Sequence, residues 1–264
     1  MKIKKVKLFI NDNLRSNKVA REVKEKLEKN KFAIVEDGFD LAIAIGGDGS
    51  FLRMVKNANF NSKCCYVGIN AGTLGFAQEV NVNEIDEFIK ILKNGDFKVE
   101  NIGVQEVTIK TKKKTIKHCS INEIVVRDEA LNTAEFEVHV DGGLLEDFVG
   151  DGLLISTSFG STAYNLSFGG SIVFNTFHTL QITPVAPLNN KAYRNLTNSV
   201  IVPDNMPITL FPKRNNGNVI ITVDGDNNFY EGVISIETVI NKTVQVIRMN
   251  DYNFIQKIND KFLK

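Results

Sequence analysis

The sequence contains few cysteines, and their spacing excludes two common roles. Cys64 and Cys65 are adjacent, Cys119 lies far from them in the chain, and no C-x-x-C spacing occurs. This pattern suits neither a disulfide framework nor a zinc site. We therefore predict three reduced cysteines in the core and no metal site built from them.

Long apolar runs and an excess of charge are also missing. No stretch of about 18 apolar residues occurs, and the N-terminal segment "MKIKKVKLFINDN" has no small-residue cleavage site. We expect neither export nor membrane insertion, and a cytoplasmic location. With 32 Lys and Arg against 31 Asp and Glu, the net charge is too small to attract nucleic acid or an anionic membrane. The basic run "KTKKKTIK", residues 110–117, is interpreted as an exposed hairpin.

The two best-known glycine-rich phosphate motifs are absent as well. The pattern G-x-x-x-x-G-K-[ST] occurs nowhere, and no G-x-G-x-x-G follows the first predicted strand. The sequence therefore supports neither a P-loop nucleotide site nor a dehydrogenase-type dinucleotide site. Any anionic ligand has to be held by another local arrangement.

The first third of the chain alternates strand-like and helix-like patterns. The segments "KVKLFI", "LAIAI" and "CCYVGI" are predicted strands. Ser16 is predicted to cap a helix that runs to Asn30, and a second periodic helix ends at Gly95. We predict a Rossmann-like α/β domain over residues 1–98.

From about residue 99 the pattern changes to short alternating segments separated by Asn-Gly and Asp-Gly turns. This spacing predicts a mostly antiparallel β domain over residues 99–249. The last segment, residues 250–264, has a helical pattern and is expected to pack back on the first domain. Exposed strands in the β domain favour a homodimer or a homotetramer.

The stretch "IAIGGDGSFLRMV" places Asp48 between glycines at the end of a buried strand, before a helix predicted to start at Phe51. Backbone N–H groups at such a junction can hold phosphate, and we expect the glycines to supply positive φ and close approach. A carboxylate would repel phosphate, so Asp48 makes sense as a proton acceptor or as a ligand of Mg²⁺ in phosphoryl transfer. The alternative is an ordinary Asx turn.

Two polar clusters lie in the predicted β domain. Asn122 and Glu123 interrupt the apolar segment "SINEIVV", where ribose hydroxyls could satisfy both, or a lysine across the sheet could pair with Glu123. The segment "GDGLLISTSFGSTAYNLSFGG", residues 150–170, carries seven hydroxyl side chains and is interpreted as a polar ligand loop. These are Ser156, Thr157, Ser158, Ser161, Thr162, Tyr164 and Ser167.

Together these stretches resemble the NAD kinase family. The matching segments are "GGDG", "GINAGTLGF" at residues 68–76, the Asn-Glu pair, the block at residues 151–170, and "VDG" at residues 223–225. They follow the family's order over most of the chain. GGDG alone is shared with diacylglycerol and sphingosine kinases and with phosphofructokinases, whereas the Asn-Glu pair and the "STAY" block are specific.

The resemblance implies an enzyme that phosphorylates the 2′-hydroxyl of the adenosine ribose of NAD with ATP, giving NADP for NADP biosynthesis. NAD and ATP would be its substrates, and Mg²⁺ would arrive with ATP rather than in a protein cage. Asp48 would be the general base, and Asp151 would contact the nicotinamide end. The other implied binding residues are Gly49, Leu52, Arg53, Phe76, Asn122, Glu123, Thr162, Ala163, Tyr164, Ser167 and Ala186.

The sequence departs from the family at two places and leaves alternatives open. Val149 stands where many bacterial members have an arginine, and Ser158 and Phe159 replace a proline and a threonine, which puts an aromatic ring near the adenine region. ATP, other triphosphates and polyphosphate would all fit a backbone nest. A non-catalytic NAD(P)-binding sensor and a GGDG-type lipid kinase remain the alternative functions.

Overall fold

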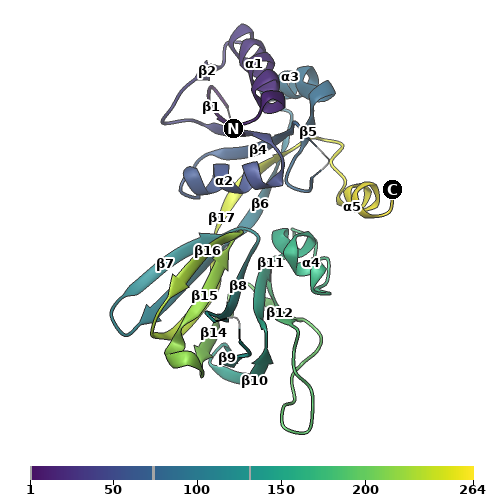
Figure 1. Cartoon of the computed structure of the whole chain (residues 1–264). Coiled ribbons are helices and arrows are strands. Elements are labelled where there is room, and N and C mark those ends of the chain that lie inside the picture. Colours follow the sequence, from purple (N-terminus) through teal and green to yellow (C-terminus); the bar gives the residue numbers. More distant parts are fainter. Residues whose placement is uncertain (1, 73–74, 131) are drawn as a thin grey trace. The chain divides into compact units, whose positions relative to one another are not determined.

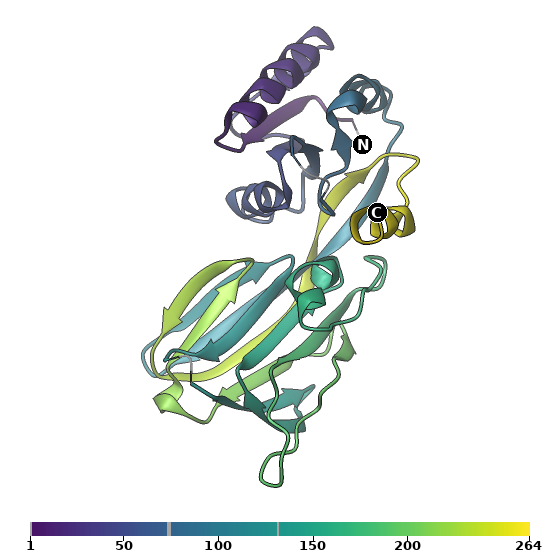
Figure 2. The ribbon, with the colours of Figure 1, turned by 45° about the vertical axis from the view of Figure 1, so that its right-hand side comes forward.

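The computed structural model describes residues 2–72, 75–130 and 132–264, and the chain divides into two compact units. Unit 1 is Met1–Asn101 together with Val244–Lys264, and unit 2 is Ile102–Thr243. Two long strands, β6 (Lys98–Thr111) and β17 (Val233–Arg248), cross from one unit into the other. Figures 1 and 2 show the ribbon from two directions.

Unit 1 is an α/β unit, as predicted. Its elements are β1 (Lys5–Ile10), α1 (Leu14–Lys29), β2 (Ala33–Ile34), β3 (Leu41–Gly46), α2 (Asp48–Asn57), β4 (Cys65–Asn70), β5 (Val80–Asn81), a 3₁₀ turn (Val82–Glu84), α3 (Ile85–Asn94) and α5 (Phe254–Phe262). The strands pair in parallel in the order β2, β1, β3, β4, with the end of β17 and β5 both on β4.

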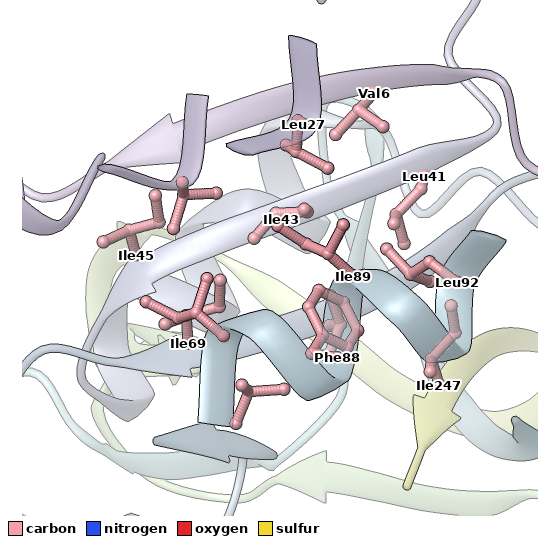
Figure 3. Close-up of a cluster of buried hydrophobic side chains, with 14 of the residues drawn as sticks. Val6, Leu27, Leu41, Ile43, Ile45, Ile69, Phe88, Ile89, Leu92 and Ile247 are labelled. Carbon is pink, nitrogen blue, oxygen red and sulfur yellow. The ribbon is translucent and has the colours of Figure 1, made fainter. Parts of the chain in front are cut away.

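The core of unit 1 explains why β3 is apolar at every position, since helices cover both faces of the sheet. Successive side chains of a strand point to opposite faces. Leu41, Ile43 and Ile45 join the cluster that α1 and α3 cover, and Figure 3 shows Phe88 and Ile89 of α3 beside them. Ala42 and Ala44 point to the opposite face and are fully buried, and α2 packs against β3.

Helix α1 begins earlier than its sequence pattern predicts. The predicted cap Ser16 lies inside the helix and is buried, and its backbone N–H donates to the side chain of the true N-cap, Asn13, over 2.8 Å. The predicted stripe of Val19, Val23 and Leu27 is buried as expected. Helix α3 ends at Gly95 with φ of 73°, which confirms the left-handed cap.

Unit 2 is mostly antiparallel β structure, as predicted, and its strands form two sheets that share one core. Its elements are β7 (Thr115–Ser120), β8 (Glu123–Asp128), β9 (Ala134–Val140), β10 (Gly143–Gly150), β11 (Gly152–Thr157), α4 (Tyr164–Ser167), β12 (Thr179–Val185), β13 (Val200–Pro203), β14 (Ile208–Pro212), β15 (Val219–Val223), β16 (Asp226–Tyr230) and 3₁₀ turns at Phe159–Thr162 and Asn215–Gly217. One sheet has the order β13, β12, β11, β8, β15, β16.

Two smaller expectations have mixed outcomes. Strands β6 and β7 pair as an antiparallel hairpin whose turn carries exposed lysines, as predicted for residues 110–117. All three cysteines are free, but only Cys64 and Cys65 are buried, and Cys119 is half-buried on β7. Within residues 2–72, 75–130 and 132–264, no helix is long and apolar enough to cross a membrane.

Candidate active site

The GGDG segment joins the end of β3 to the start of α2. Gly47 is the N-cap, and Asp48 is the first residue of α2, so the helix starts three positions before Phe51. Only Gly46 of the three glycines has a positive φ, which corrects the expectation that all of them need one. A Cβ at Gly47 would meet no atom within 4 Å, so open space lies in front of a helix N-terminus that favours anions.

This junction also lies where the order of the parallel strands reverses. From β1 the chain passes to β2 on one side and then to β3 on the other. Ligands of open α/β sheets bind beyond the carboxyl ends of the strands at such a switch point. Asn11 follows β1 there, and its Oδ1 accepts a 2.8 Å hydrogen bond from Nη2 of Arg53 on α2. Ser50 Oγ accepts a second one.

The carboxylate of Asp48 is held by a turn from a distant part of the chain. Its two oxygens accept the backbone N–H groups of Phe76 and Ala77, each over 3.0 Å. These long-range contacts are not those of an Asx turn. A Cβ at Gly75 would lie 2.1 Å from Asp48 Oδ1, so only glycine allows the turn to approach this closely. Because a carboxylate oxygen has two lone pairs, each can still accept a proton or a hydrogen bond.

The remaining predicted residues of unit 1 lie on α2 or in the turn that holds Asp48. Gly49 is the second residue of α2, and Leu52 is half-buried on the same helix. Phe76 is half-buried, and its ring packs on two phenylalanines of α5. Thr73 and Leu74, which belong to the "GINAGTLGF" segment, lie outside the described residues.

In unit 2, Asn122 and Glu123 stand where β8 begins and are held by Asp224. The carboxylate of Asp224 accepts the backbone N–H groups of Ile121, Asn122 and Glu123 and the hydroxyl of Ser120, over 2.7 to 3.2 Å. The "VDG" segment is part of the family resemblance, but the sequence alone does not place Asp224 in the site. Its Asp-Gly turn signal was the available clue.

Glu123 is a buried carboxyl group without a cationic partner in the described part of the chain. The backbone N–H of Tyr164 donates to it, but no described residue forms a hydrogen bond with its Oε2. Burial, followed by the charge of Asp224, raises the pKa of Glu123 to about 8. The alternative of a lysine pair across the sheet is therefore wrong, and an orphaned buried oxygen is left for a ligand.

The hydroxyl-rich segment is only partly available to a ligand. Ser156, Thr157, Ser158 and Ser161 are buried. Their hydroxyls donate to backbone carbonyls of Thr157, Ile121, Phe177 and Val173, respectively. The interpretation that all seven serve a ligand is wrong for these four, since they fasten the loop. The accessible hydroxyls are those of Thr162, Tyr164 and Ser167.

The other predicted residues of unit 2 gather around α4 and the end of β12. Tyr164 is exposed, accepts a hydrogen bond from Arg127 Nη2 over 3.2 Å and packs edge-on against Phe168. Ala163 precedes it and is half-buried. Asp151 is exposed, and Ala186 adopts a φ of 45°, which is costly without glycine.

Val149 and Phe159, which depart from the family pattern, are both buried within unit 2. Val149 is buried, and its backbone N–H and C=O are both bonded to the side-chain amide of Asn195. Phe159 is also buried and lines a small cavity with His178 and Ile240. The expectation that this ring lies near the adenine region stays a prediction, and the burial of the ring shows that it packs within unit 2.

The described residues contain no group of three or more His, Cys, Asp or Glu side chains that could hold a metal ion. The donor set around Asp48 offers one carboxylate. Mg²⁺ is often bound by one or two carboxylates together with substrate phosphates and water. These residues therefore fit a metal that arrives with a nucleotide, but do not fit a resident metal held by a protein cage.

Comparisons with known proteins agree with this arrangement. Residues 3–97 match the family model of the ATP-NAD kinase N-terminal domain, and residues 121–247 match that of the ATP-NAD kinase C-terminal domain. The chain is 39% identical to the NAD kinase of Finegoldia magna over 98% of its length and 97% of that protein. It is 32% identical to the NAD kinase of Streptococcus gordonii over 98% and 96%.

Two solved structures share the fold. The structure of yeast NADH kinase with NADH has a TM-score of 0.86 at 20% identity, with 100% of this chain and 88% of that chain covered. The structure of an Archaeoglobus fulgidus NAD kinase with ATP has a TM-score of 0.73 at 19% identity, with 97% and 98% covered.

Proposed function

Because the chain belongs to the ATP-NAD kinase family, we propose that it transfers the γ-phosphoryl group of ATP to the 2′-hydroxyl of the adenosine ribose of NAD. In this reaction the 2′-oxygen forms a bond to the γ-phosphorus, the bond from that phosphorus to the bridging oxygen breaks, and ADP leaves. The products are NADP and ADP, and the hydroxyl proton passes to a base.

The observation that carries this proposal is the position of Asp48. Its carboxylate stands in the first turn of α2, at the switch point of the sheet, and two backbone N–H groups fix its orientation. A general base has to be held within reach of the proton that it abstracts. The helix N-terminus and Arg53 supply positive charge for phosphate oxygens in the same unit.

Unit 2 supplies groups suited to the acceptor nucleoside. Asn122 and Glu123 offer an amide and a carboxyl to ribose hydroxyls, and the orphaned Glu123 Oε2 supports this role. Tyr164 offers an exposed ring face for stacking. Thr162, Ala163, Ser167, Asp151 and Ala186 are proposed to line the rest of the dinucleotide site. When bound with ATP, Mg²⁺ neutralises charge on the transferring phosphoryl group.

The test is a coupled assay with NAD, ATP and Mg²⁺ in which an NADP-specific dehydrogenase reports NADP. We expect Asp48→Asn to lower kcat by roughly 10²- to 10⁴-fold, because the base is lost. The Kd for NAD, measured by calorimetry, should change by less than about threefold, because the amide keeps the shape of the side chain.

Asp86→Asn is the matched control for this variant. Asp86 also lies in the first turn of a helix of unit 1, but its side chain is exposed and pairs with Lys26. We expect wild-type kcat for Asp86→Asn. Wild-type turnover by Asp48→Asn would exclude Asp48 as the base. NAD binding without NADP formation by the wild-type protein would favour a sensor instead.

A further inference from the structure

Helix α5 is fastened to the turn that holds Asp48. This turn comprises residues 75–79, and its backbone N–H groups at Phe76 and Ala77 donate to the Asp48 carboxylate. The carbonyl groups of the same turn accept hydrogen bonds from α5. Lys257 Nζ donates to the carbonyl oxygen of Gln78 over 2.5 Å and lies 3.5 Å from that of Phe76.

The ammonium group of Lys257 is largely buried, and its side chain is 16% exposed. Burial lowers the pKa of Lys257, while the charge of Glu79, 3.3 Å away, opposes this effect. Glu79 also pairs with Arg248 over 3.0 Å, so removal of Lys257 leaves Glu79 with a partner. The carbonyl groups of Phe76 and Gln78 would lose the donor that Lys257 provides.

Aromatic packing holds the same turn from the side. The ring of Phe76 lies 5.2 Å from that of Phe262 and 6.2 Å from that of Phe254, between centroids, and both partners belong to α5. Lys257 lies between these two positions in the sequence of α5. Helix α5 therefore contacts both the side chain and the backbone of Phe76.

From these contacts we infer that Lys257 is a positioning residue for phosphoryl transfer, which acts on Asp48 through the turn at residues 75–79. The ammonium group fixes the carbonyl side of the turn, and the turn presents its N–H groups to the carboxylate. This inference depends on the proposed role of Asp48 as the base. Lys257 itself touches no reacting atom, so its loss should slow the chemical step and leave the affinity for NAD largely unchanged.

Three variants test the inference in the assay described above. Lys257→Met keeps the aliphatic stem and removes the donor, and we expect kcat to fall about 10- to 100-fold, because small displacements of a reacting group are this costly. The KM for NAD should change by less than about threefold. Lys257→Arg restores a donor and should recover most of kcat. Lys264→Met, on the exposed end of the chain, should match the wild type.

Hydrogen exchange at the amides of Phe76 and Ala77 gives a second readout that does not depend on turnover. We expect both amides to lose protection in Lys257→Met, while β3 and α1 keep theirs. If Lys257→Met does not fold, Lys257→Gln, which retains an N–H donor of shorter reach, replaces it, with a smaller loss of kcat expected.

The outcomes separate this inference from the proposed function. Wild-type kcat in Lys257→Met, or equal loss of kcat in the methionine and arginine variants, would overturn it even if Asp48→Asn is inactive. A rise in the KM for NAD with kcat unchanged would also overturn it. If Asp48→Asn keeps turnover, the proposed base is wrong, and loss of protection at Phe76 and Ala77 would then report only a structural clamp.

Discussion

The carboxyl groups of Glu123 and Asp224 are both buried in unit 2, and the charge of Asp224 raises the pKa of Glu123. Four donors converge on Asp224, so its charged form is supported, although burial still raises its pKa. Glu123 accepts a hydrogen bond from the Tyr164 backbone, and its pKa of about 8 keeps it protonated at neutral pH. A protonated Glu123 can both donate to and accept from a ribose hydroxyl.

The raised pKa predicts a pH dependence of stability. The folded state holds the Glu123 proton up to about pH 8, whereas the unfolded chain releases it near 4.5. The folded state therefore binds more protons in this window, and the free energy of unfolding falls as pH rises through it. We expect Glu123→Gln to weaken this fall, measured as urea unfolding of unit 2 followed at pH 5, 6.5 and 8.

A partly exposed glutamate that pairs with Lys26 provides the control for that measurement. Glu22→Gln on α1 removes a carboxylate with 43% side-chain exposure and should leave the pH dependence unchanged. The same decline in the wild type and in Glu123→Gln would contradict the assignment of the titration to Glu123.

The sequence shows polar residues in apolar surroundings, but it does not show which groups they bond to. Glu123 was conspicuous because it interrupts a buried strand. Asp224 was not, since an Asp-Gly pair after a strand is also an ordinary turn signal. The hydroxyls of Ser156 and Ser161 were misassigned because a count of hydroxyl groups cannot distinguish those that bond the backbone internally from those that face a ligand.

At the scale of elements, α1 offers a clean test of capping. The side chain of Asn13 accepts the N–H of Ser16, one of the N–H groups at the helix start that have no partner within the helix. We expect Asn13→Ala to destabilise unit 1 by about 1 kcal/mol. Asn17→Ala, at an exposed position inside the same helix, should be neutral or slightly stabilising, because alanine has the higher helix propensity. Thermal unfolding followed by circular dichroism compares the two.

The elements of unit 1 were predictable because their apolar period is strong and unbroken. The strand of residues 41–46 is apolar on both faces, and Val19, Val23 and Leu27 recur at the four-residue spacing of a buried helix face. Boundaries were less predictable, since both Asn13 and Ser16 are good caps. Helix α2 begins at Asp48 because Gly47 already has an extended cap conformation, which the sequence does not reveal.

At the scale of the molecule, unit 1 is assembled from two separate segments of the chain. Gln245 and Val246 of β17 pair with β4, and Ile247 and Met249 enter the core. We expect a fragment of residues 1–101 to lack a cooperative thermal transition by circular dichroism, because the sheet loses a strand and the core loses two side chains.

A fusion of residues 1–101 to 244–264 is the matched comparison for this fragment. Strands β6 and β17 are hydrogen-bonded neighbours, so a short Gly-Ser linker can join them. We expect the fusion to melt cooperatively. A cooperative transition in the fragment alone would show that the last segment is dispensable for folding.

The contact between Lys257 and the turn at residues 75–79 joins two segments that are synthesised at different times. A ribosome makes Asp48 early, then all of unit 2, and only afterwards the segment that carries Lys257. The turn that holds the carboxylate is therefore made before unit 2, whereas the Lys257 contact that fixes this turn is made after it. A truncation that removes α5 would keep every residue of unit 2 and of the 75–79 turn, but it would take away the donor that Lys257 gives to that turn.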